Sequence, residues 1–285
     1  MTLPPTLQSQ YERLRTILSE MGSVAIGYSG GIDSTLLIRV AADVLRDRAL
    51  AVIGRSETYP TREFEEAVEM ARSFGARYRV VATEETDNMK FQENPANRCY
   101  FCKTELFGKL GAIAKEEGLQ WIADGTITDD LKDFRPGMLA KSENDVRSPL
   151  YEAGVSKDDV RQVARALGIS SWDKPSFACL ASRFPYGYGI TKENLRRVDE
   201  AESYLRDLGF RTFRVRHHDD RTARLEFGPT EFERMFEASM RTTVVQKMKD
   251  LGYVYVALDL SGYRTGSMNE VLTTAEKKAA KEGQA

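Results

Sequence analysis

Short apolar runs alternate with helical patterns along the first half of the chain. The runs that predict strands lie at residues 24–28, 50–53, 77–81 and 121–123. Between them, apolar residues recur at the spacing of an amphipathic helix, first at residues 36–44 and again after Pro60, where Gly75 marks the helix end. Strands separated by amphipathic helices form βαβ units. We therefore predict an α/β fold with a doubly wound parallel sheet and helices on both of its faces.

The pattern changes in the second half. Ser156 is positioned to cap a helix that ends near Gly168, with Asp159 three residues further on. Residues 174–189 are rich in Pro, Gly and aromatic side chains and lack periodicity, which predicts a loop or linker. Beyond it we expect a helix, a hairpin, a helix and a strand, at residues 191–208, 210–227, 230–251 and 253–260. This order predicts a second, smaller α+β domain, so we expect domains at 1–182 and 183–285, with a tail that frays from Thr273.

Composition narrows the class of protein. Hydrophobic residues make up 41% of the chain and charged residues 29%, which excludes a disordered or fibrous chain. The net charge of −2 argues against a surface built to bind nucleic acid, although it leaves room for a local basic patch. No apolar run approaches the ~20 residues of a membrane span, and the N-terminus does not have the pattern of a signal peptide. We expect a cytoplasmic protein whose three cysteines are reduced thiols.

A glycine-rich segment, residues 29–35 with the sequence Ser-Gly-Gly-Ile-Asp-Ser-Thr, separates the first strand from its helix. We call it the glycine loop. Glycines let the backbone turn sharply and bring N–H groups close to an anion, and the start of the helix adds partial positive charge. Asp33 fits beside phosphates if it holds a cation such as Mg²⁺. The simpler alternative is a tight turn before a well-capped helix, since the pattern is neither a Walker A loop nor G-x-G-x-x-G.

The glycine loop resembles the pyrophosphate-binding loop of the N-type ATP pyrophosphatases, the PP-loop superfamily. Its members cleave ATP between the α- and β-phosphates and adenylate a substrate. The resemblance implies a sheet of the adenine nucleotide alpha hydrolase-like class, where ligands contact the ends of the strands. It also implies the residues that bind ATP and the leaving pyrophosphate with its Mg²⁺, which are Ser29, Gly30, Gly31, Asp33, Ser34, Thr35, Asp124 and Gly125.

Several further segments resemble the LarE family of ATP-dependent sulfur transferases, and the resemblance covers about residues 20–270. They lie at residues 133–137, 147–150, 174–187 and 258–266. Members act in making the nickel-pincer nucleotide, the cofactor of lactate racemase. They adenylate a carboxylate of pyridinium-3,5-biscarboxylic acid mononucleotide and convert it to a thiocarboxylate. An acyl-adenylate carries AMP as a leaving group, which a sulfur nucleophile can displace.

The three cysteines leave the source of sulfur open. In one branch of the family a cysteine at the position of Cys179 gives up its own sulfur and becomes dehydroalanine. This chain also has Cys99 and Cys102, a pattern that resembles the branch whose three thiolates hold a [4Fe-4S] cluster with one iron open for an extra sulfide. The alternatives are a redox pair, inert buried thiols, or a zinc site completed by His217 or His218. We favour the cluster, because a purely sacrificial mechanism gives the Cys-x-x-Cys pair no task.

Arginines alternate with apolar residues in the predicted hairpin and recur near the end of the chain. Guanidinium groups suit phosphate and carboxylate ligands, whereas the simpler interpretation is a solvated sheet face. The resemblance implies that Arg183, Arg214 and Arg264 bind the substrate. It also implies that Ser182, Arg183 and Glu202 act with Asp33 and Cys179 in catalysis, although Glu202 fits a surface carboxylate equally well.

The sequence leaves other functions open. One is a tRNA thiolase of the same superfamily, which predicts a basic surface, and the net charge of −2 with no recognisable RNA-binding module argues against it. Another is an ATP pyrophosphatase that amidates a carboxylate with ammonia, as NAD synthetase does, which has no use for Cys179. A third is a nucleotide-binding regulator without catalysis. For the sulfur transferase we expect a small nucleotide substrate, no nucleic acid or membrane partner, a homo-oligomer, and contacts with other proteins of the cofactor pathway.

Overall fold

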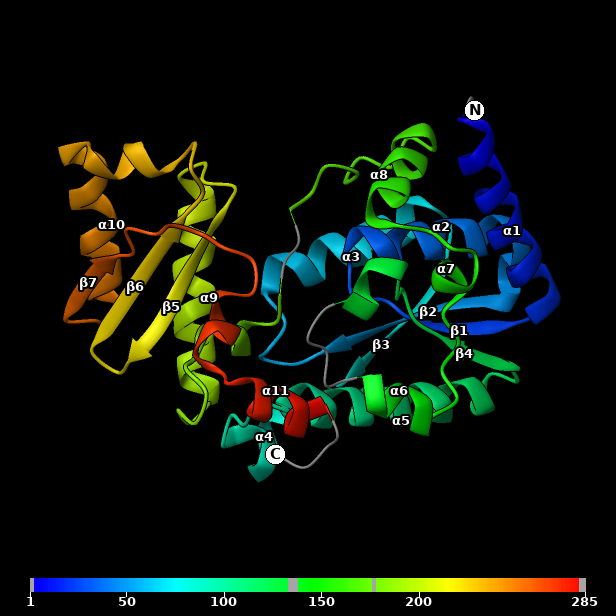
Figure 1. Cartoon of the computed structure of the whole chain (residues 1–285), viewed down its shortest axis with the longest axis horizontal. Helices are drawn as coiled ribbons and strands as arrows, with labels where there is room; N and C mark the ends of the chain where they lie inside the picture. The colour runs from blue at the N-terminus through cyan, green and yellow to red at the C-terminus, as the bar shows by residue number, and fades with distance from the viewer. Residues whose placement is uncertain (1–2, 133–137, 176–177, 282–285) are drawn as a thin grey trace.

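Two β-sheets lie toward opposite ends of the long axis in the computed structural model, which describes residues 3–132, 138–175 and 178–281 (Figure 1). The first sheet is parallel and has the strand order β3-β2-β1-β4. Its strands are β1 (Val24–Gly27), β2 (Ala49–Arg55), β3 (Arg77–Ala82) and β4 (Trp121–Ala123). The predicted α/β fold with a parallel sheet is confirmed, and each predicted strand lies within a few residues of an observed one.

Helices cover both faces of this sheet (Figure 1). On one face lie α1 (Pro5–Met21), α2 (Ile32–Leu45), α3 (Thr61–Ser73) and α8 (Lys157–Ala166), and on the other lie α5 (Arg98–Glu116) and α6 (Met138–Glu143). The central strands β1 and β2 are largely apolar because both of their faces are buried: Ile26 and Ile53 pack with the first group of helices, whereas Leu50 and Val52 pack with the second. The short helices α4 (Met89–Gln92) and α7 (Pro149–Glu152) connect these elements.

The predicted cap of α8 is confirmed. The Ser156 hydroxyl accepts from the Asp159 N–H at 3.3 Å, and the Asp159 carboxylate accepts from the Ser156 N–H at 2.9 Å. This capping box satisfies two N–H groups that the first turn of a helix leaves without partners. It fixes the point where α8 begins, beside the carboxyl edge of the sheet. Among the described residues, no helix has both the length and the apolar character needed to cross a bilayer.

The second sheet has three strands in the order β5-β6-β7, with one antiparallel and one parallel pair. The strands are β5 (Phe213–Asp219), β6 (Thr222–Phe227) and β7 (Tyr255–Leu258), and the helices α9 (Lys192–Asp207) and α10 (Ala238–Asp250) belong to the same part of the chain. Phe213, Val215 and Leu225 pack with Val244 and Met248 in a separate core. The smaller α+β arrangement follows the predicted element order. The predicted division at residues 182 and 183 stays a prediction.

Two expectations for this half are wrong. Residues 230–251 do not form one helix: a 3₁₀ turn at Phe232–Phe236 precedes α10, and the extended backbone of Glu237 separates them. The tail does not fray from Thr273, because α11 (Thr274–Lys281) begins there and Ala280 is buried. The Thr273 hydroxyl accepts from the Glu276 N–H, and Glu276 accepts from the Thr273 N–H. This reciprocal cap holds the start of the helix.

Candidate functional site

The glycine loop joins β1 to α2 at the carboxyl edge of the first sheet. Gly30 has φ +67°, and a Cβ built on it would lie 2.9 Å from both the Tyr59 hydroxyl and the Ala67 Cβ. Gly31 then forms the N-cap of α2. Both the positive φ and the lack of space require glycine at position 30. The loop therefore presents backbone rather than side chains, as a phosphate-binding turn requires.

Hydroxyl groups hold the glycine loop in this shape. Ser34 Oγ donates to the Gly31 carbonyl at 3.0 Å and lies 3.1 Å from Ser29 Oγ. Thr35 Oγ1 lies 3.2 Å from the Tyr28 hydroxyl, and burial raises the pKa of Tyr28 to about 12. These bonds are made within the loop and its flanking strand. The loop is thus shaped before any ligand binds.

The end of β4 closes the other side of the loop. Ala123 pairs with Ile26 of β1, which brings the two following residues, Asp124 and Gly125, beside α2. A Cβ on Gly125 would lie 2.8 Å from the Ser34 nitrogen. Asp124 is 9% exposed and accepts from the Thr126 hydroxyl at 2.6 Å. The structure therefore brings together the residues predicted to bind ATP and pyrophosphate.

Asp33, the predicted Mg²⁺ ligand, is paired with a lysine. Lys157 Nζ lies 2.9 and 2.8 Å from the two carboxylate oxygens of Asp33. Lys157 is the first residue of α8 and follows the cap Ser156, while its backbone N–H donates to Asp129 at 2.9 Å. Lys157 was not predicted as a site residue from the sequence. The capping box was the one signal that could have found it, since it placed the start of a helix after a strand of the parallel sheet.

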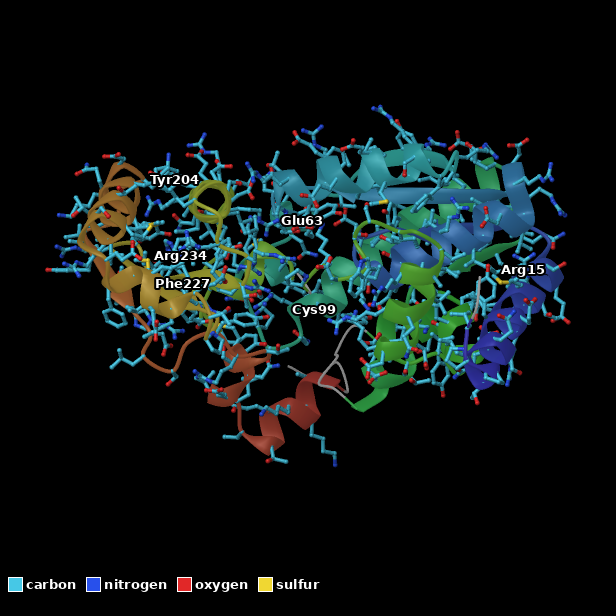
Figure 2. The ribbon with its side chains drawn as sticks, turned by 90° about the horizontal axis from the view of Figure 1, so that it is seen from above. Arg15, Glu63, Cys99, Tyr204, Phe227 and Arg234 are labelled. Carbon is cyan, nitrogen blue, oxygen red and sulfur yellow. The ribbon has the colours of Figure 1, made fainter. Side chains whose placement is uncertain are left out.

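The three cysteines share one neighbourhood, which also contains the buried Arg98. Cys99 and Cys102 lie in the first turns of α5, and Cys179 is the N-cap of the 3₁₀ turn Leu180–Arg183. Cys102 and Cys179 pack against the same apolar cluster. Figure 2 shows Cys99 in the middle of the molecule, between the end that carries Arg15 and the end that carries Phe227. We call these three cysteines and Arg98 the cysteine neighbourhood.

The thiols of this neighbourhood influence one another. Burial raises the pKa of Cys102 well above its usual range, and the charges of Glu85 and the other two cysteines raise it further. Burial also raises the pKa of Cys179, against the opposing effect of the Arg98 guanidinium. Over residues 3–132, 138–175 and 178–281, however, no three His, Cys, Asp or Glu side chains are already placed as ligands of one metal ion. The three thiols therefore lie in one neighbourhood, but the described side chains there are not arranged as a metal centre.

His217, one of the histidines considered for a zinc site, has other partners. Its ring lies 4.9 Å from the Phe184 ring, its Nδ1 is 3.0 Å from the Tyr253 hydroxyl, and its Nε2 is 3.4 Å from Asp220. Burial lowers the pKa of this histidine, which keeps the ring neutral. Both nitrogens thus face groups of the second half rather than a thiol.

A buried ion pair ties the Cys179 segment to α9. Arg183 is 1% exposed, and its Nε and Nη2 donate to the two carboxylate oxygens of Glu202 at 2.9 and 2.7 Å. Arg183 Nη1 also donates to the Ala178 carbonyl at 2.7 Å and to the Ser182 hydroxyl at 2.9 Å. Burial alone would raise the pKa of the Glu202 carboxyl, but Arg183, Arg214 and the Val215 N–H together outweigh it, and the net shift is downward. Glu202 is therefore not a surface carboxylate.

The other predicted substrate arginines lie in different settings. Arg214 stacks over the Tyr263 ring at 4.8 Å, and burial, followed by the nearby Arg183, lowers its pKa. It lines a cavity of about 530 Å³ together with α3, the linker and α9, and also a smaller one that Arg183 and Glu202 share. Arg264 lines neither cavity and pairs with Glu270 at 3.1 Å. Arg183, Arg214 and Glu202 thus line one cavity, and Arg264 is not among its lining residues.

This fold and loop define a class of protein. A glycine turn that leads from a buried parallel strand into a helix, with the end of a neighbouring strand beside it, is the arrangement of an α/β nucleotide-binding protein. The NAD synthase family matches residues 7–107, which include the glycine loop and the first three strands. Of the other segments that carry the family resemblance, residues 133–137 lie outside the described part of the chain, as do 176 and 177.

Similar proteins give the particular family. Pyridinium-3,5-bisthiocarboxylic acid mononucleotide synthase of Lactiplantibacillus plantarum is 38% identical over 272 residues, 95% of this chain and 98% of the relative. An uncharacterized protein of Synechocystis sp. is 43% identical over 94% of this chain and 99% of its own length. The glutamine-hydrolyzing GMP synthase of Chlamydia muridarum is 24% identical over 65% of this chain and 38% of its own. The chain belongs to the family of pyridinium-3,5-bisthiocarboxylic acid mononucleotide synthases, the LarE family, as predicted.

Proposed function

We propose that this enzyme uses ATP to adenylate a carboxylate of a pyridinium-dicarboxylate mononucleotide and then replaces one carboxylate oxygen with sulfur. The observation that carries the proposal is the position of Cys179. The N–H of the next residue, Leu180, donates at 2.8 Å to the carbonyl of Thr58, which lies three residues beyond the end of β2. Cys179 therefore sits at the same carboxyl edge of the sheet as the glycine loop, where a nucleotide and a sulfur source can meet.

The reaction has two steps whose atoms balance. A substrate carboxylate oxygen attacks the α-phosphorus of ATP, the bond from that phosphorus to the α,β-bridging oxygen breaks, and pyrophosphate leaves with this oxygen and its electron pair. A sulfur nucleophile then attacks the acyl carbon of the adenylate, and AMP leaves with the former carboxylate oxygen. Backbone N–H groups of the glycine loop hold the leaving pyrophosphate. Mg²⁺ would neutralise charge on it, and Asp33 would hold the ion, since carboxylate oxygen is the ligand type that Mg²⁺ prefers.

The sulfur comes from the cysteine neighbourhood. Cysteine thiolates are the usual ligands of iron–sulfur clusters, and the donor set here is three cysteines, two of which have their pKa raised in part by the charge of a neighbouring cysteine. Cys99, Cys102 and Cys179 would hold a [4Fe-4S] cluster once their side chains are brought together, and such a cluster supplies a transferable sulfide. The alternative within the same proposal is that Cys179 gives up its own sulfur atom and is consumed.

Arginines hold the substrate in this proposal. Arg214 lines both cavities and is the residue best placed to bind the phosphate, since its planar guanidinium donates two parallel hydrogen bonds. Arg183, Glu202 and Ser182 fix the Cys179 segment against α9, and Arg264 would reach the substrate only by leaving Glu270. We also infer a cytoplasmic homo-oligomer that passes its product to other proteins of the cofactor pathway.

Two measurements on the full chain test the proposal. Pyrophosphate release from MgATP should depend on the pyridinium substrate. The product formed from that substrate should be a thiocarboxylate. Intact mass before and after turnover separates the sulfur sources, because a sacrificial Cys179 loses about one H₂S whereas a cluster leaves the polypeptide mass unchanged. Release without substrate, or an amide formed when ammonia replaces the sulfur source, would contradict sulfur transfer and favour the amidating synthases.

A further inference from the structure

One short segment touches the glycine loop, the Cys179 segment and the second half of the chain. It runs from residue 56 to residue 63, between β2 and the first turn of α3, and we call it the bridging segment. Its Thr61 N–H and hydroxyl donate to Asp199 of α9 at 3.2 and 2.7 Å, and its Glu63 accepts from Arg206 at 2.7 Å. Figure 2 shows Glu63 between the two ends of the molecule. The segment is thus held at its far end by α9.

Near its start the bridging segment is anchored to a buried carboxylate. Ser56 Oγ and Thr58 Oγ1 both donate to Glu85 Oε1, at 2.5 and 2.7 Å, and Glu85 is 2% exposed. The Thr58 carbonyl accepts from the Leu180 N–H at 2.8 Å. A displacement of Thr58 would therefore move the backbone on which the Cys179 thiol is carried.

The next residue, Tyr59, reaches the glycine loop. Its hydroxyl donates to the Ser29 carbonyl at 2.7 Å, and its ring meets Phe64 edge-on at 6.1 Å. The Ser29–Gly30 peptide is trans and planar, so its carbonyl and its N–H point in opposite directions. By holding the Ser29 carbonyl, Tyr59 turns the Gly30 N–H away from itself, which is the direction an anion in the loop needs.

We propose that Tyr59 is a positioning residue that couples pyrophosphate binding in the glycine loop to the backbone of the Cys179 segment. The inference rests on the proposed function, because it assumes that pyrophosphate occupies the loop. An anion bound to the Gly30 N–H holds the peptide in the orientation that Tyr59 also requires, so each contact strengthens the other. When Tyr59 is held in place, the adjacent Thr58 is held with it, and the Thr58 carbonyl in turn holds the N–H of Leu180. Such coupling is reciprocal, so a fixed Cys179 segment also favours pyrophosphate.

Tyr59→Phe tests the proposal, because it keeps the ring against Phe64 and removes only the hydroxyl. We expect magnesium pyrophosphate, titrated into the full chain by calorimetry, to bind about tenfold more weakly to this variant, the loss that one hydrogen bond of ~1.4 kcal/mol gives. In the unchanged protein, hydrogen–deuterium exchange of peptides covering residues 178–184 should slow several-fold when pyrophosphate binds. In Tyr59→Phe this slowing should disappear even at saturating pyrophosphate, where weaker binding no longer explains it.

Tyr78→Phe is the matched control. The Tyr78 hydroxyl accepts from Arg72 at 2.7 Å, away from the glycine loop, so both pyrophosphate affinity and the slowing of exchange should remain. If pyrophosphate slows exchange at residues 178–184 equally in Tyr59→Phe, or slows it in neither protein, the coupling is wrong while the proposed function stands. If the unchanged protein binds no magnesium pyrophosphate, the nucleotide site itself is wrong and the coupling falls with it.

Discussion

The glycine loop and the cysteine neighbourhood differ in how far each is already arranged for chemistry. Every feature that a phosphate needs is present in the loop, with a left-handed Gly30, an N-cap at Gly31 and hydroxyls bonded within the loop itself. In the cysteine neighbourhood, burial and the charges of neighbouring cysteines raise the pKa of Cys102 and of Cys179, yet among the described side chains the three thiols do not form a ready set of metal ligands. The backbone fixes the shape of the glycine loop, whereas the cysteine neighbourhood would become a metal centre only when a cluster binds to it.

The largest expected effect is that of Cys179→Ala, which should separate sulfur transfer from pyrophosphate release. Cys179→Ala should abolish thiocarboxylate formation, because it removes the only thiol carried by the segment tied to Thr58. Substrate-dependent pyrophosphate release should stay within about twofold, because the glycine loop is shaped by its own bonds. Both products are measured in one reaction. Loss of pyrophosphate release as well would contradict two separable sites.

Cys99→Ser and Cys102→Ser then distinguish the sulfur sources. If the three thiolates hold a cluster, either change should bring the iron content after anaerobic reconstitution from about four per chain to near zero. If Cys179 is sacrificed, both variants should still complete a single turnover, and Cys179 should appear as dehydroalanine in the mass spectrum. The two outcomes exclude each other.

The next effect concerns what holds the sulfur site in place. Arg183→Ala leaves the Glu202 carboxylate buried without its partner, so we expect the free energy of unfolding to fall by about 3–5 kcal/mol. Chemical denaturation measures it. Arg264→Ala is the matched control, because it breaks a pair with Glu270 whose side chains are 39% and 57% exposed, and it should leave the free energy of unfolding almost unchanged. If the two variants lost the same free energy of unfolding, the buried pair of Arg183 and Glu202 would not hold the Cys179 segment in place.

The same buried pair predicts an acid dependence of stability. The pKa of Glu202 is lower in the folded chain than in the unfolded one, because Arg183, Arg214 and the Val215 N–H together outweigh the effect of burial. The carboxylate therefore stabilises the fold above its unfolded pKa, and this contribution is lost as the pH falls through the folded value. Glu202→Gln should be less stable at neutral pH and lose less of its remaining stability on acidification, as melting temperatures across a pH series would show.

A smaller effect tests the preformed loop. Gly30→Ala places a Cβ 2.9 Å from Tyr59 and Ala67 at a φ of +67°, so we expect ATP affinity to fall roughly ten- to a hundredfold, the cost of ~1–3 kcal/mol of strain. Gly75→Ala is a matched control, since Gly75 has φ +63° but a Cβ there would meet nothing within 4 Å. It should lower stability by a similar backbone strain and leave ATP affinity unchanged. Calorimetric titration with MgATP measures both.

What the sequence could predict follows from the range of the interactions. The strands and the capping box of α8 arise from residues a few positions apart, and the glycine loop is one continuous motif, so all were predictable. Asp33 and Lys157 are 124 positions apart, and Arg183 meets Glu202 across 19. Arg183 and Glu202 were predicted only by family resemblance, and their mutual pairing was not, because no local pattern shows which charged residue a fold will bury. Lys157 and Tyr59 were missed because their partners, Asp33 and the Ser29 carbonyl, lie 124 and 30 positions away in the sequence.

The smallest predicted effect concerns Lys157, the residue that the sequence did not reveal. Its ammonium pairs with Asp33, and it would contact a phosphate of ATP if Mg²⁺ took over the carboxylate. Lys157→Met should therefore weaken MgATP binding by about tenfold, the value of one charge-assisted hydrogen bond. It should also lower the Mg²⁺ concentration needed for half-maximal ATP binding, because the ammonium no longer competes for Asp33. Lys109→Met, which breaks surface pairs with Glu84 and Glu105, should change neither quantity. An unchanged Mg²⁺ midpoint in Lys157→Met would mean that the Mg²⁺ ion does not bind at Asp33, and the glycine loop would then rely on its backbone alone.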